Sequence, residues 1–187
     1  MNKRLFTALL VLAMALALLP SAALADNATN VYVGRQPIPA NGASVAIADG
    51  GTATYSSGKL TLNGVKVTKG NYYSNEGAAI YANGDLVIEL VGESEVAGPD
   101  GTNYSCGVAV GGNLTIRGNG QLIATSGDVN TNFSVGVLTR PGDITILGGT
   151  VKVIGKTSPD ISAGVSALVG SITVSGGSLE GVGGSMT

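Results

Sequence analysis

The chain has 187 residues with 10 basic and 12 acidic side chains, a formal net charge of −2, one cysteine, and neither histidine nor tryptophan. This composition excludes a Ser/His/Asp catalytic triad and an intramolecular disulfide, and the lack of a basic stripe argues against nucleic acid as a partner. The length favours a single domain.

Residues 1–25 have the pattern of a secretory signal peptide. Lys3 and Arg4 precede a long apolar run, and the segment ends in Ala-Leu-Ala, the small-x-small arrangement at which signal peptidase cleaves. After cleavage near Ala25 the chain keeps 8 basic and 12 acidic residues, a net charge near −4. No second apolar run of this length follows, so we expect a secreted or cell-surface protein that is not embedded in a membrane.

Residues 26–57, which include VYVGRQPIPANG and TATYSSG, do not follow the repeat that begins at residue 58. We predict that they form an N-terminal cap of strands over the first coil of that repeat. An uncovered coil end would present unpaired backbone N–H and C=O groups to other chains, and the cap would cover them.

A repeat of about 28 residues occupies residues 58–187. Each unit begins with a glycine that precedes an aliphatic-polar-aliphatic run, at Gly58, Gly84, Gly112, Gly142 and Gly170. Two more short runs of β type follow in each unit, and no window has the spacing of an amphipathic helix. We therefore predict an all-β protein, a right-handed parallel β-helix of about five coils with the last coil incomplete. Left-handed β-helices use shorter coils built on hexapeptides.

Alternation within each unit predicts which side chains point outward. The middle of the first run forms an outward ladder through Thr61, Val87, Thr115, Thr145 and Thr173. The next outward positions are uneven, so this face favours cross-strand packing over an ice-binding surface; they are Asn63, Glu89, Arg117, Leu147 and Ser175. Neighbouring coils align Glu89 with Arg117, and Lys152 with Glu180, which predicts two exposed ion pairs.

Alternation in the third run of each unit sends Tyr104, Phe133 and Ile161 inward. Cys106 lies two residues after Tyr104 and points the same way. We therefore predict that these four side chains belong to the core of the β-helix.

The repeated phrases resemble those of a known group of proteins. AAIYANGDLVIELVG, CGVAVGGNLTIRGNGQLIA and PGDITILGGTVKVIG, with VYVGRQPIPANG near the start, are similar to exported bacterial carbohydrate-binding-domain proteins that carry a pectate-lyase-like right-handed β-helix. The resemblance covers nearly all of residues 30–187. It implies that the chain binds a polysaccharide, with calcium as a candidate cofactor, and it assigns no ligand residue by residue.

The loops that join the second run of each unit to the third are the candidate ligand site. KGNYYSNEG, AGPDGTNYS, TSGDVNTNF and KTSPDIS are expected to stack along one edge of the β-helix. Flat aromatic rings bind the C–H faces of sugars, and amide or carboxylate groups bridge their hydroxyls. The predicted carbohydrate-binding residues are Tyr72, Tyr73, Asn75, Glu76, Asp100, Asn103, Asp128, Asn130 and Asn132. The open alternative is that these loops are only solvated.

A second candidate site lies at a corner of the coils. Asp85, Asn113 and Asp143 each follow the glycine that begins a unit, so three oxygen-bearing side chains line one corner. Calcium takes six to eight hard oxygen ligands, more than this row supplies by itself. We interpret the row first as side-chain caps of the turns and keep a calcium site as the alternative.

These features predict an exported, non-catalytic module that binds carbohydrate or acts at the cell surface. No ladder places two carboxylates on adjacent coils beside a base, and the GxSxG, phosphate-loop and zinc patterns are absent. The alternatives are a structural or adhesive β-solenoid that binds proteins, and a polysaccharide lyase-like enzyme. The last segment, GGVGGSMT, stops partway through a coil, so we also expect self-association through this uncapped coil.

Overall fold

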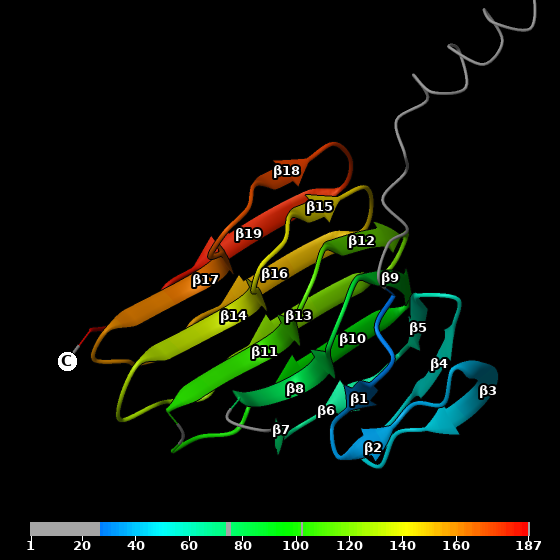
Figure 1. The fold of residues 1–187 in the computed structure, drawn as a ribbon, viewed down its shortest axis with the longest axis horizontal. Coiled ribbons are helices and arrows are strands. Elements are labelled where there is room, and N and C mark those ends of the chain that lie inside the picture. Colours follow the sequence, from blue (N-terminus) through cyan, green and yellow to red (C-terminus); the bar gives the residue numbers. More distant parts are fainter. Residues whose placement is uncertain (1–26, 74–75, 102, 187) are drawn as a thin grey trace, which may run out of the picture.

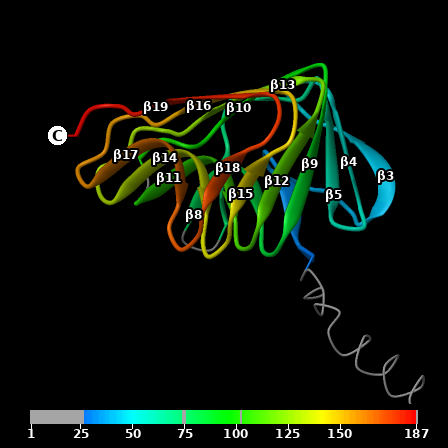
Figure 2. The same cartoon turned by 90° about the horizontal axis from the view of Figure 1, so that it is seen from above.

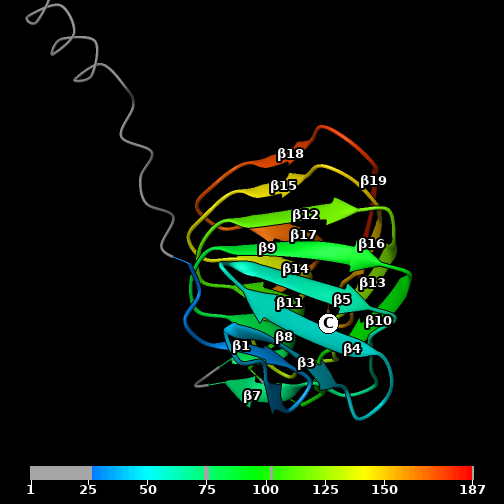
Figure 3. The same ribbon diagram turned by 90° about the vertical axis from the view of Figure 1, so that its right-hand side faces the viewer.

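The structure is a computed structural model that describes residues 27–73, 76–101 and 103–186. Within these residues the chain forms strands β1 to β19 and no helix. The strands wind into a right-handed parallel β-helix, which confirms the predicted fold class (Figure 1, Figure 2 and Figure 3). The described part of the chain therefore holds no helix that is long and apolar enough to cross a membrane.

Three parallel sheets form the walls of the β-helix, and each coil adds one strand to each sheet in turn. The first sheet contains β5 (Lys59–Asn63), β9 (Leu86–Val91), β12 (Leu114–Gly118), β15 (Ile144–Ile146) and β18 (Ile172–Val174). The second contains β6 (Lys66–Val67), β10 (Glu93–Ala97), β13 (Gln121–Thr125), β16 (Thr150–Ile154) and β19 (Ser178–Val182). The third contains β8 (Glu76–Ala82), β11 (Tyr104–Val110), β14 (Phe133–Thr139) and β17 (Ile161–Ala167). The chain thus makes four complete turns, and β18 and β19 begin a fifth.

Antiparallel strands extend two of these sheets at the N-terminal edge. A hairpin of β3 (Asn41–Ala46) and β4 (Thr52–Ser56) continues the first sheet beyond β5. The short strands β1 (Val31–Val33) and β2 (Gln36–Pro37) continue the third sheet beyond β8, and β7 (Asn71–Tyr73) pairs with the start of β8. The residues before the repeat therefore occupy strand edges that the first coil would otherwise expose (Figure 3).

Columns of aliphatic side chains fill the interior of the β-helix. Each inward position stacks on the equivalent position one coil later, because the parallel strands pair in register. A fully buried side chain of this kind contributes about 1.5–3 kcal/mol, so these columns are the main stabilising term. One column from each sheet consists, respectively, of Leu60, Ile88, Ile116 and Ile146; of Val67, Val96, Ala124 and Val153; and of Ile80, Val108, Val137 and Val165.

The first coil is shifted by two residues from the predicted ladder. The structure pairs Thr61 with Glu89, whereas the spacing of the glycines predicted Thr61 beside Val87. A shift of two residues leaves the same side chains inward, so hydrophobic alternation does not distinguish the two registers. The predicted threonine ladder is wrong at Thr61, and its members from Val87 to Thr173 do pair in sequence.

Both predicted ion pairs form between neighbouring strands. Arg117 Nε lies 2.7 Å from Glu89 Oε2, and Lys152 Nζ lies 3.0 Å from Glu180 Oε1. All four side chains are partly exposed, so each pair contributes about 0–1 kcal/mol. The interpretation of these residues as exposed cross-strand pairs is confirmed.

Cys106 is buried in an apolar cluster as predicted, but Cys106, Tyr104 and Phe133 do not point into the interior of the β-helix. Cys106 and Val108 are two residues apart, yet Val108 belongs to the main core and Cys106 to a separate apolar cluster on the outer face of the third sheet. Alternation breaks at Gly107, where an added Cβ would lie 2.7 Å from the Gly136 carbonyl oxygen and 2.8 Å from the Thr125 nitrogen. The Tyr104 and Phe133 rings meet edge to face at 5.3 Å on that outer face. Ile161, next in this ladder, is 39% exposed.

Candidate functional site

The loops between the second and third sheets stack along one edge of the β-helix. This surface, the loop edge, consists of residues 68–73, 98–101 with Asn103, 126–132 and 155–160. Backbone hydrogen bonds join one loop to the next: Gly101 N–H donates to the Asp128 carbonyl at 2.8 Å, and Val129 N–H donates to the Thr157 carbonyl at 3.0 Å. The loops are therefore held at the same coil-to-coil spacing as the strands that they connect.

Two of the predicted ligand residues, Asp100 and Asp128, lie one above the other on consecutive coils. Asp100 Oδ1 accepts the backbone N–H of Asp128 at 3.0 Å, and Asp128 Oδ1 accepts that of Thr157 at 3.0 Å. Lys156 Nζ lies 3.9 Å from Asp100 Oδ1. Sequence reasoning missed this lysine, although its position two coils after Asp100 was a usable signal. Both carboxylates are exposed, and the second oxygen of each accepts no hydrogen bond from the described residues.

Asparagine side chains form a second polar row on the same loop edge. Asn103 Oδ1 accepts a hydrogen bond from Thr131 Oγ1 at 2.8 Å, and both residues are exposed. Asn130 is exposed as well, whereas Asn132 is half-buried and adopts a left-handed backbone with φ 62°. Asn75 lies outside the described residues. The structure thus brings Asn103, Asn130 and Asn132 to one surface with the two aspartates.

The adjacent tyrosines of β7 have opposite environments. Tyr72 is 50% exposed, and its hydroxyl donates to the Asp100 carbonyl at 3.1 Å, so its ring is held beside the aspartate row. Tyr73 is only 9% exposed and its hydroxyl donates to the Gly34 carbonyl. Its ring packs against Tyr32 at 4.7 Å and Tyr81 at 5.1 Å. Of these two predicted carbohydrate-binding tyrosines, only Tyr72 has a ring that a ligand can reach.

Glu76, another predicted carbohydrate-binding residue, forms a salt bridge with Arg140. Arg140 Nη1 lies 2.8 Å from Glu76 Oε1, and the guanidinium carbon lies 4.8 Å from the centre of the Tyr104 ring and 5.6 Å from that of Phe133. Arg140 Nε and Nη2 are buried without a hydrogen-bond partner among the described residues, and the faces of the two rings compensate for this in part. This pair covers the outer-face cluster that contains Cys106.

The Cys106 thiol lies within this cluster and is 1% exposed. Its pKa is raised to about 12, mainly by burial and to a lesser extent by the Glu76 carboxylate, while Arg140 opposes the shift. A thiol with this pKa is uncharged at neutral pH and is a poor nucleophile. Its role is therefore packing, although on the outer face of the sheet and not in the predicted core.

The corner residues Asp85, Asn113 and Asp143 form a continuous chain of caps. Asp85 Oδ1 accepts the Asn113 N–H at 2.6 Å, Asn113 Oδ1 accepts the Asp143 N–H at 2.9 Å, and Asp143 Oδ1 accepts the Ser171 N–H at 2.7 Å. Each side chain thus satisfies a backbone group of the next coil, which supports the capping interpretation. No group of three or more Asp, Glu or Cys side chains gathers as a metal site in the described residues.

No known protein that could indicate the function of this surface is found to be similar to the chain. Comparison with protein families, with curated proteins and with solved structures finds no match to this chain. The loop edge itself brings one exposed ring beside stacked carboxylates and amides.

Proposed function

We propose that this chain is an exported, non-catalytic module that binds a polysaccharide along the loop edge. The observation that supports the proposal is the exposed ring of Tyr72, which its hydroxyl fixes next to the carboxylates of Asp100 and Asp128. A ring supplies the apolar face that a sugar packs against, and the carboxylates accept hydrogen bonds from its hydroxyls.

Rigidity of the loop edge favours binding of an extended chain. The Asp100, Asp128 and Thr157 positions repeat at the coil spacing and are tied by side-chain and backbone hydrogen bonds. A surface that is already ordered loses little conformational entropy when a ligand binds, so modest contacts on several coils add up to useful affinity. A polymer that runs across the coils meets the Asp100 and Asp128 carboxylates in turn.

A glycan array with and without calcium tests the proposal. We expect binding of at least one polysaccharide by the wild-type chain, and a loss of about fivefold or more in Tyr72→Ala. Tyr72→Phe keeps the ring and removes the hydroxyl that holds it beside Asp100, so it should bind more weakly than wild type and more tightly than Tyr72→Ala. Equal binding by wild type and Tyr72→Ala would show that the ring is not the platform.

The two other predicted classes have their own tests. Binding to immobilised proteins with no response on the glycan array would favour the adhesive solenoid. Release of products that absorb in the ultraviolet from polygalacturonate would establish the lyase-like alternative and overturn the non-catalytic proposal. Calcium binding at Asp85, Asn113 and Asp143 is tested by calorimetric titration of wild type against Asp143→Asn, where a capping role predicts no saturable heat in either.

Export and self-association are further parts of the proposal. The predicted signal, residues 1–25, lies outside the described residues, and N-terminal sequencing of the protein from culture medium and cell envelope tests its cleavage. Contact between copies at the last coil is supported by exposed apolar side chains there, namely Leu168, Val169, Ile172, Val174 and Val182. Sedimentation should show a concentration-dependent oligomer that Ile172→Lys weakens.

A further inference from the structure

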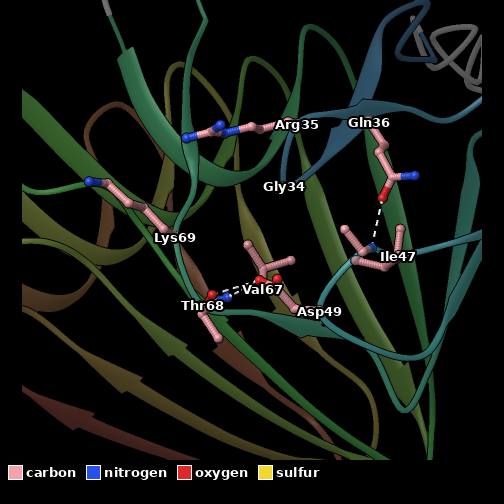
Figure 4. A pocket seen from close by; sticks show the side chains of 9 residues that line it. Gly34, Arg35, Gln36, Ile47, Asp49, Val67, Thr68 and Lys69 are labelled. Atoms are coloured by element: carbon pink, nitrogen blue, oxygen red, sulfur yellow. Dashed lines mark hydrogen bonds between the residues drawn. The ribbon is translucent and has the colours of Figure 1, made fainter.

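A pocket lies between the N-terminal cap and the first loop of the loop edge, away from the rows of aspartates and asparagines. It has a volume of about 290 Å³ and forms where three segments meet: the turn between β1 and β2, the turn between β3 and β4, and the chain after β6. We propose that this cap pocket binds a carboxylated sugar unit, with Arg35 and Lys69 holding the carboxylate. Figure 4 shows the side chains that line it.

The distribution of positive charge points to this pocket. Eight basic residues follow the predicted signal peptide, and four of them, Arg117, Arg140, Lys152 and Lys156, form the ion pairs found between described residues. The other four are Arg35, Lys59, Lys66 and Lys69. Arg35 and Lys69 line the pocket, and the Cβ of Lys66 packs 3.7 Å from the position of a Cβ on Gly50, in the turn that borders it. Of the four cations without an ion pair among the described residues, Arg35 and Lys69 thus line the pocket, Lys66 lies beside it, and Lys59 lies away from it.

The cations and the acid of the pocket lie on different sides of it. Arg35 and Lys69 extend toward the same side in Figure 4, and the Asp49 carboxylate points to Thr68. Asp49 Oδ2 accepts both the backbone N–H and the hydroxyl of Thr68, each at 2.7 Å. These two hydrogen bonds lower the pKa of Asp49, and the charges of Lys66 and Arg35 lower it further. Its other oxygen has no hydrogen bond from the described residues and can accept one from a ligand hydroxyl.

The walls of the pocket are ordered before any ligand arrives. Gln36 Nε2 donates to the Ala46 carbonyl at 2.9 Å, and its Oε1 accepts the Ala48 N–H at 3.0 Å, so this side chain braces the β3–β4 turn. The floor is apolar, since Ile47 is 6% and Val67 2% exposed. A fixed apolar floor with charged groups at the rim is typical of a site that binds one face of a small ring.

These features select the chemistry of the ligand. The guanidinium of Arg35 offers paired N–H donors that match a carboxylate, and the ammonium of Lys69 adds a second charge. The apolar floor suits the C–H face of a ring, and Asp49 suits a hydroxyl. Ligand pockets usually have volumes of about 300–1,000 Å³, so a pocket at the lower limit fits one sugar unit and not a long segment. An acidic sugar at the end or side of a polymer meets all three requirements.

Calorimetric titration of the chain with D-glucuronate tests this inference. We expect saturable binding of glucuronate, about tenfold weaker binding in Arg35→Gln, and a similar loss in Lys69→Gln, because each substitution removes one charge-assisted contact. Added salt should weaken the wild-type interaction. D-glucose has the same ring without the carboxylate and should bind at least about tenfold more weakly.

Lys59→Gln is the matched control, because it removes an equal charge from β5, away from the pocket. It should bind glucuronate as the wild type does. Equal weakening in Lys59→Gln and Arg35→Gln would overturn the inference, as would equal affinity for glucose and glucuronate. Tyr72→Ala should leave glucuronate binding unchanged. The cap pocket can therefore fail this test while polysaccharide binding along the loop edge holds, and the reverse is also true.

Discussion

Asp100 and Asp128 occupy the same position on consecutive coils, and the carboxylate of the first accepts the backbone N–H of the second at 3.0 Å. Asp85 and Asn113 have the same relationship at another corner, at 2.6 Å. In both places the chain turns and the strand ladder is interrupted, so a side-chain oxygen replaces the missing backbone acceptor. The polar loop residues therefore build the solenoid as well as its candidate binding surface.

This dual role makes Asp128→Ala destabilising. The substitution leaves the Thr157 N–H without its acceptor, and we expect the free energy of unfolding to fall by about 0.5–1.5 kcal/mol. Urea unfolding followed by circular dichroism measures the change. Asn130→Ala is the control in the same loop, because Asn130 is exposed, and it should change stability by less than about 0.5 kcal/mol. Equal effects of the two substitutions would contradict a capping role for Asp128.

The strands could be predicted because two patterns occur together in every coil: a glycine that begins each unit, and an alternating aliphatic-polar-aliphatic run that follows it. The aliphatic-polar-aliphatic run that follows each unit glycine became β5, β9, β12, β15 and β18. Register was harder to predict where the period changes. Thr61 pairs with Glu89 because β5 follows a hairpin and not another coil, and a two-residue shift leaves its inward face unchanged.

The sequence predicted which loops form the candidate site better than it predicted which of their side chains are exposed. The repeat placed Asp100 and Asp128 together because both occupy the same position of the unit. Alternation alone could not decide which of Tyr72 and Tyr73 faces solvent, since that depends on Tyr32 and Tyr81 from distant segments. The cap pocket was missed for the same reason: Arg35 and Lys69 come together only through the non-repeating cap.

The break at Gly107 has an equivalent at Gly136, which makes a second prediction. A Cβ on Gly136 would lie 2.5 Å from the Gly164 carbonyl oxygen and 2.6 Å from the Ile154 nitrogen, and both are backbone atoms that cannot move aside cheaply. We expect Gly136→Ala to lower stability by about 3 kcal/mol or more. At Gly181 a Cβ would only touch side-chain atoms at 3.8 Å, so Gly181→Ala should be tolerated. Thermal unfolding of both variants gives the comparison, and similar melting temperatures would contradict this account.

The buried thiol of Cys106 should resist modification in the folded chain. Its pKa of about 12 leaves roughly a thousandfold less thiolate at pH 8 than a free cysteine has, and the side chain is 1% exposed. Labelling with a disulfide reagent should therefore be slow in buffer and fast in denaturant. Asn130→Cys supplies an exposed reference thiol in the same molecule. If Cys106 reacts as fast as this reference in the folded state, the outer-face cluster does not protect it.

Tyr73 should make the fold sensitive to alkaline pH. Its pKa is raised to about 12, mainly by burial and in part by the neighbouring Tyr32, with Arg35 opposing the shift, and an unfolded tyrosine titrates near pH 10. Between these values the unfolded chain loses the proton and the folded chain retains it, so the stability contribution of Tyr73 is complete below about pH 10 and falls as pH rises toward 12.

Tyr73→Phe lacks both this titration and the hydrogen bond to the Gly34 carbonyl. Urea unfolding at pH 8 to 11 should therefore show wild type more stable than Tyr73→Phe at pH 8, with the difference shrinking above about pH 10. The two proteins share every other titratable side chain, so those contributions cancel in that difference, and two parallel curves would show that Tyr73 keeps an ordinary pKa.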